Sequence, residues 1–132
     1  MKYALDTNII TYYLKGNEKI LDKVDQEAES DNIIIPPFAY FEVKKWLMAV
    51  NSKTKLQAFE KLFEKCGIDV IEKETLDLSL SIYIKLRKNG ITVDDGDLLI
   101  AAYCMQNNYI LVSNNQKHFE KIENIQVVNW TT

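Results

Sequence analysis

The sequence predicts an α/β protein, a three-layer α/β/α sandwich around a central, mostly parallel sheet of about five short strands. Short apolar, often β-branched runs recur along the 132-residue chain, and stretches with helical periodicity separate them. Strands that are joined through helices form parallel sheets, and both faces of such a sheet are covered. The length suits one hydrophobic core, so residues 1–132 are predicted to form a single domain.

The chain begins with the strand around which the rest is predicted to be organised. Residues 3–5 form an apolar run, typical of a strand buried on both faces, and the run stops at Asp6. Helices are predicted over 8–15 and 18–30, because apolar residues recur there at helical spacing and Gly16 can end the first of them. Asp6 therefore falls at the carboxyl end of a central strand.

The middle of the chain alternates in the same way. Residues 33–35 are three consecutive isoleucines, which indicate a strand, and two prolines stop it. Helices are predicted over 38–51 and 53–65, the first beginning directly after the prolines and the second ending at Gly67. The apolar run 68–71 is predicted to be a further strand.

The remaining elements follow the same rules. A helix is predicted over 75–88, and the most apolar helix of the chain over 98–106. Residues 109–112 are predicted to form a strand, 117–121 a short helix or turn, and 125–130 a last strand.

Composition excludes several classes of protein. The net charge of −3 gives no overall attraction to nucleic acid or to an acidic membrane, although a local basic rim would suffice for RNA. No apolar run reaches membrane-spanning length, and the N-terminus does not have the pattern of a signal peptide. The only cysteines, Cys66 and Cys104, lack metal-site spacing and are predicted to be buried thiols. A cytoplasmic protein is expected.

Three carboxylates are the main candidates for chemistry. Asp6 lies where open α/β sheets bind ligands, although it could simply cap the next helix. Glu42 has apolar neighbours one helical turn away and should have a partner, a proton or a metal ion, unless it pairs with Lys45 at the edge of that face. Asp97 precedes the apolar helix, for which it could serve as N-cap.

A fourth segment, Ser113 to Phe119, follows another strand end. Asn115 could orient a water or a carboxylate by hydrogen bonding. His118 is the only histidine and is more often a surface residue than a ligand in such a place. Asp94 belongs to an Asp-Asp-Gly turn and is an outside candidate.

Carboxylates that converge at one sheet edge repel one another unless a cation neutralises them. Oxygen ligands suit Mg²⁺ or Mn²⁺, and such an ion can clamp a phosphodiester and activate water. The expected chemistry is metal-assisted phosphodiester hydrolysis. The chain contains no P-loop, no dinucleotide-binding glycine pattern and no nucleophile elbow, so those classes are not supported.

The order and spacing of these motifs resemble PIN domains, and more closely the toxins of the VapC type. The resemblance covers almost the whole chain and rests on five segments: Leu5-Asp6-Thr7-Asn8, Glu42, Asp97 to Ala102, Ser113-Asn114-Asn115 with Phe119, and Val127 to Trp130. It implies a Mg²⁺- or Mn²⁺-dependent endoribonuclease whose partners are RNA, a cognate antitoxin protein and, as a homodimer, a second copy of the chain.

The resemblance also implies roles. Asp6 and Asp97 match the family's main metal-binding aspartates, and Glu42 matches its active-site glutamate, which ligates the ion or acts as general base. Asn115, with Thr7, would orient water or the aspartates. Many members have an acid directly before the phenylalanine, where this chain has His118. Two alternatives stay open, namely a housekeeping RNA-processing PIN nuclease and an inactive PIN-like module that binds partners.

Overall fold

The computed structural model describes residues 1–67 and 69–132, and its centre is a sheet of four parallel strands. The strands are β1 (Tyr3–Leu5), β2 (Ile33–Ile34), β3 (Ile110–Val112) and β4 (Val127–Val128), in the spatial order β2-β1-β3-β4. The predicted α/β class with a parallel sheet is confirmed, with one strand fewer than expected. β1 and β3 are the inner strands, so the predicted central position of the first strand is also correct.

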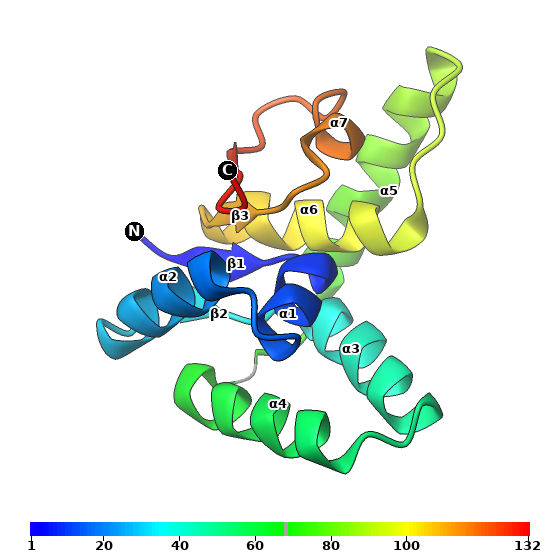
Figure 1. The fold of residues 1–132 in the computed structure, drawn as a ribbon. Helices are drawn as coiled ribbons and strands as arrows, with labels where there is room; N and C mark the ends of the chain where they lie inside the picture. Colours follow the sequence, from blue (N-terminus) through cyan, green and yellow to red (C-terminus); the bar gives the residue numbers. More distant parts are fainter. Residues whose placement is uncertain (68) are drawn as a thin grey trace.

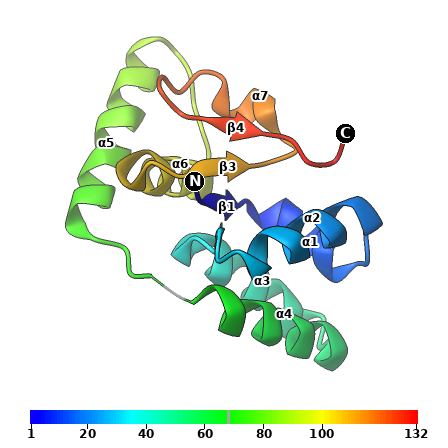
Figure 2. The ribbon, with the colours of Figure 1, turned by 90° about the vertical axis from the view of Figure 1, so that its left-hand side faces the viewer.

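Seven helices in the described part of the chain flank this sheet. They are α1 (Thr7–Leu14), α2 (Glu18–Glu29), α3 (Pro37–Ala49), α4 (Lys53–Cys66), α5 (Lys73–Lys88), α6 (Asp95–Asn107) and α7 (Gln116–Phe119). Figures 1 and 2 show α1 to α4 gathered around the β1–β2 half of the sheet and α5 to α7 around the β3–β4 half. None of the helices described is long and apolar enough to cross a membrane.

The strand predicted over 68–71 is wrong for the residues that can be judged. Ile68 lies outside the described residues, and residues 69–71 form no strand. Val70 is 69% exposed, so the described part of this run, residues 69–71, lies outside the sheet. The last predicted strand, over 125–130, shrinks to Val127–Val128. Apolar β-branched composition favours a strand only where a neighbouring strand can pair with it.

The core is built on the inner strands. Leu5 and Val112 are fully buried and directly opposite each other in the register of β1 and β3. The backbone N–H of Asp6 then donates to the carbonyl of Val112 at 3.0 Å. Because both strands run in the same direction, their carboxyl ends bring Asp6 and Ser113 together at one edge of the sheet.

Both cysteines are free thiols, as predicted. Cys104 is buried in α6, and Cys66 at the end of α4 is half-buried. Burial raises the pKa of the Cys66 thiol to about 11 and raises that of Cys104 as well. A thiol that stays protonated is a poor nucleophile, so neither cysteine has the properties of a catalytic residue.

Candidate functional site

Asp6 lies at the end of β1 and is 5% exposed. Its carboxylate accepts two hydrogen bonds, one from the backbone N–H of Thr7 at 2.8 Å and one from the hydroxyl of Ser113 at 2.8 Å. The hydrogen bond from Thr7 makes Asp6 the N-cap of α1. The sequence indicates this capping role as the alternative to ligand binding. The hydrogen bond from Ser113 ties the Asp6 carboxylate at the end of β1 to the end of β3. Capping of α1 does not require this bond.

Glu42 on α3 joins the same edge through Thr7. The Thr7 hydroxyl donates to Glu42 Oε1 at 2.8 Å, while the Thr7 backbone N–H donates to Asp6. One residue therefore holds two carboxylates from two elements. The alternative pairing of Glu42 with Lys45 is not what the structure contains, because the Lys45 ammonium lies over the Phe41 ring at 5.6 Å.

Asp97 lies in the first turn of α6, and the prediction that it caps this helix is wrong. The helix begins two residues earlier, and the N-cap is Asp94, whose carboxylate accepts the N–H of Gly96 at 3.2 Å. The earlier acid of the Asp-Asp-Gly turn takes the capping position, which leaves the Asp97 side chain available for other contacts. That side chain is 22% exposed, and its Oδ2 lies 3.3 Å from Nδ1 of His118.

Gly96 explains how α6 approaches α3 so closely. A Cβ atom at this position would lie 2.6 Å from Cε1 of Phe38, so only glycine leaves the Phe38 ring where it is. This contact fixes the start of α6 against the helix that bears Glu42. Asp97 and Glu42 are thereby held on neighbouring helices.

In the segment after β3, the side chain that contacts Asp6 is that of Ser113 and not that of Asn115. Ser113 is fully buried, donates to Asp6 Oδ2, and accepts the backbone N–H of Asn115 at 3.0 Å. Asn115 thus reaches the network through its backbone, and its predicted orienting role stays a prediction. Asn114 donates to the Tyr12 hydroxyl at 3.0 Å. Sequence reasoning noticed this segment but missed the role of Ser113, for which the signal is a hydroxyl directly after an inner strand.

The Asp6 and Asp97 carboxylates of this edge are costly to ionise. Burial raises the pKa of Asp6, while the hydrogen bonds from Ser113 and Thr7 oppose that rise. Burial also raises the pKa of Asp97, the negative charge of Asp6 raises it further, and His118 opposes both effects. The two aspartates are close enough to repel each other, and each is costly to ionise without a positive charge nearby.

The carboxylate oxygens of Asp6, Glu42 and Asp97 are the kind of ligand that a hard divalent ion prefers. The three side chains do not form a ready-made metal-binding cluster. In the part of the chain that the structure describes, no three His, Cys, Asp or Glu side chains are close enough together to hold a metal ion. The negative charge of Asp6 nevertheless raises the pKa of Asp97, and Glu42 is linked to Asp6 by one threonine. Oxygen ligands of this kind suit Mg²⁺ or Mn²⁺.

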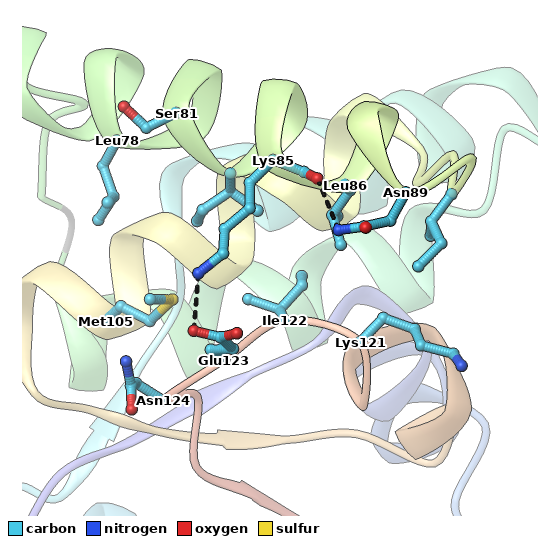
Figure 3. Close-up of a pocket in the computed structure, with 12 residues that line it drawn as sticks. Leu78, Ser81, Lys85, Leu86, Asn89, Met105, Lys121, Ile122, Glu123 and Asn124 are labelled. Carbon is cyan, nitrogen blue, oxygen red and sulfur yellow. Dashed lines mark hydrogen bonds and ion pairs between the residues drawn. The ribbon is translucent and has the colours of Figure 1, made fainter.

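A cavity of about 290 Å³ lies elsewhere, between α5, α6 and the segment that follows α7. Figure 3 shows the ion pair across it, in which Lys85 Nζ lies 2.7 Å from Glu123 Oε2. None of the residues that line it is one of the candidate carboxylates. Its walls are largely apolar, so we assign it no part in the chemistry of the acidic edge.

Comparison with known proteins agrees with this geometry. A family model described as the PIN domain matches residues 3–125. Among curated proteins, the chain is 31% identical to the protein named Ribonuclease VapC1 of Haemophilus influenzae strain R2866, over 99% of each chain.

Solved structures give the same result. One is described as VapBC2 from Rickettsia felis bound to a DNA fragment from their promoter, with 27% identity, a TM-score of 0.83, and coverage of 98% of this chain and 99% of that one. Another is VapBC-1 from nontypeable Haemophilus influenzae, with 28% identity, a TM-score of 0.81 and full coverage of both chains.

Proposed function

Because this chain belongs to the PIN domain family, we propose that it is an endoribonuclease that acts as the toxin of a toxin–antitoxin pair and uses Mg²⁺ or Mn²⁺ to hydrolyse RNA. The single observation that supports this most strongly is the meeting of Asp6 and Asp97 at the sheet edge, where the negative charge of Asp6 raises the pKa of Asp97. The relatives named as VapC ribonucleases support the choice of RNA as substrate.

In this proposal Asp6 and Asp97 hold the divalent ion, which when bound would polarise the phosphodiester and supply an activated water. Ser113 and Thr7 fix the orientation of the Asp6 carboxylate. Glu42 Oε1 is occupied by the Thr7 hydroxyl, so the second oxygen of Glu42 can contact the ion or accept a proton from water. Asn115 is proposed to orient water beside these groups.

Two protein partners belong to the proposal. The first is an antitoxin, supported by structural neighbours that are described as VapBC complexes. The second is another copy of this chain. Exposed leucines on α5, Leu76 at 44% and Leu80 at 61%, offer apolar surface for such a contact. Light scattering on the purified chain, alone and with its antitoxin, would measure both associations.

The proposed activity is tested by incubating purified, antitoxin-free protein with a mixed pool of cellular RNA in Mg²⁺, in Mn²⁺ and in EDTA. We expect discrete cuts in either metal and none in EDTA, and sequencing of the new ends would identify the target. Cuts that persist in EDTA would contradict metal-dependent hydrolysis. An intact RNA pool in every condition would favour the alternative of a partner-binding module.

The burial of Asp6 also predicts an unusual dependence of stability on pH. Its folded-state pKa is raised above the ordinary value of 3.8, so in the window just above 3.8 the native protein binds more protons than the unfolded chain. The free energy of unfolding in EDTA must therefore contain a contribution from Asp6 that falls as pH rises through this window.

Replacing Asp6 with asparagine removes that contribution. In EDTA at pH 7 we expect Asp6→Asn to melt at a higher temperature than the wild type, because a neutral amide avoids the cost of burying the Asp6 charge. The difference should shrink as the pH falls towards 4. Melting curves recorded across this range measure it, and a variant that is less stable than the wild type at pH 7 would show that the buried charge is not destabilising.

A further inference from the structure

A second cavity, of about 260 Å³, borders the acidic edge. One wall is the loop that leads into α6 and the other is formed by α7 and the residues just after it. Asp97 lies on the first wall, and Lys117, His118 and Lys121 lie on the second. The cavity therefore combines two carboxylates, Asp94 and the proposed metal ligand Asp97, with the only histidine of the chain and two lysines.

The two lysines are not engaged with acids. Among the ion pairs within residues 1–67 and 69–132, neither Lys117 nor Lys121 takes part. Lys85, on the other side of this region, is held by Glu123. Figure 3 shows the Lys121 ammonium directed away from that ion pair. Both free ammonium groups are exposed and line the cavity, so they can meet an anion without first breaking an ion pair.

His118 contacts Asp97 and lines the same cavity as the two lysines. Its Nδ1 lies 3.3 Å from Asp97 Oδ2, and its side chain is 58% exposed. Its charge influences Asp6 as well as Asp97. A carboxylate at this position would add a fourth negative charge to those of Asp6, Glu42 and Asp97 and repel an incoming anion. The imidazole adds no negative charge to the cavity wall next to Asp97.

We propose that this cavity holds a backbone phosphate of the RNA substrate, beside the bond that is cut, with Lys117 and Lys121 as its cationic contacts. This inference rests on the proposed function, because it assigns one substrate subsite of the proposed nuclease. Phosphate is the anion that a polynucleotide presents next to a phosphodiester held at Asp6 and Asp97. The lysines supply charge without reading the base, so the subsite positions RNA and does not select its sequence.

The experiment measures the affinity of a short, fluorescently labelled 2′-O-methyl RNA of mixed sequence in EDTA, by anisotropy at several salt concentrations. Lys117→Gln and Lys121→Gln should each weaken binding and lower the salt slope by about 0.7, the value for one lost contact on a single strand. Lys85→Gln is the matched control, since it removes a lysine that Glu123 already holds, and it should bind like the wild type.

A second pair of variants tests the wall that His118 forms. His118→Asp and His118→Asn are nearly equal in size and differ in charge, and we expect the aspartate variant to bind the RNA about tenfold more weakly than the asparagine variant. Equal affinities for these two variants, wild-type affinity in both cavity lysine variants, or no saturable binding by the wild type would each overturn the phosphate subsite.

These experiments distinguish failure of the phosphate subsite from failure of the proposed nuclease activity. Metal-dependent RNA cleavage by the wild type together with unchanged binding by the Lys117 and Lys121 variants would reject the subsite and keep the nuclease. Lysine-dependent binding together with an absence of cleavage would reject the nuclease and show an RNA-binding module that uses this cavity.

Discussion

Asp6→Asn is expected to lower the rate of RNA cleavage by about a hundredfold to a thousandfold, the usual effect of removing one preorganised electrostatic group. The substitution keeps the shape of the side chain. An asparagine oxygen can still accept the Thr7 N–H, and its amide can donate to Ser113, so the fold should be retained. The rate is measured as single-turnover cleavage in Mg²⁺ of an RNA that the wild type cuts.

A matched control distinguishes this loss from a general effect of charge. Asp95→Asn makes the same chemical change at an exposed position in the first turn of α6, two residues before Asp97. We expect its cleavage rate to stay within about twofold of the wild type. Full activity in a folded Asp6→Asn protein would remove Asp6 from the site.

The second large effect is on stability. Phe59 of α4 is fully buried, with its ring centroid 5.6 Å from that of Tyr40 on α3 and 6.4 Å from that of Phe63. Phe59→Ala is expected to lower the free energy of unfolding by about 3–5 kcal/mol, because it removes buried apolar surface and leaves a cavity. Urea denaturation measures the change in metal-free protein.

The comparison variant is Met48→Ala, which truncates a side chain that is 64% exposed on α3. It should change the free energy of unfolding by less than about 1 kcal/mol. A small effect at Phe59, similar to that at Met48, would mean that the packing of α4 on α3 contributes little to stability. In that case α4 would not be what holds the helix bearing Glu42 in place.

Much of the fold could be predicted because its elements have clear periodicity. The first strand, the three-isoleucine strand and the apolar helix near Asp97 were all expected near their observed places, and the PIN resemblance is confirmed by the match to residues 3–125. The strand predicted over 68–71 shows the limit of this reasoning. Composition does not say whether an apolar run finds a neighbouring strand, and Val70 lies exposed.

The site could be predicted less completely, because its contacts join residues far apart in the sequence. Asp6 and Asp97, for example, are 91 positions apart, yet the charge of Asp6 acts on Asp97 in the folded protein. The hydrogen bond from Ser113 to Asp6 spans 107 positions, and its only local sign is a hydroxyl directly after an inner strand. The capping role of Asp97 was wrong for a local reason, since Asp94 offers a carboxylate to Gly96 first.

The most direct test of the account is the binding of Mn²⁺ to metal-free protein, measured by calorimetry on the wild type, Asp6→Asn and Asp97→Asn, with Asp95→Asn as control. We expect saturable binding by the wild type and the control, and its loss or severe weakening in the other two variants. Equal binding by all four proteins, or no binding by the wild type at millimolar Mn²⁺, would contradict the claim that Asp6 and Asp97 share a divalent ion.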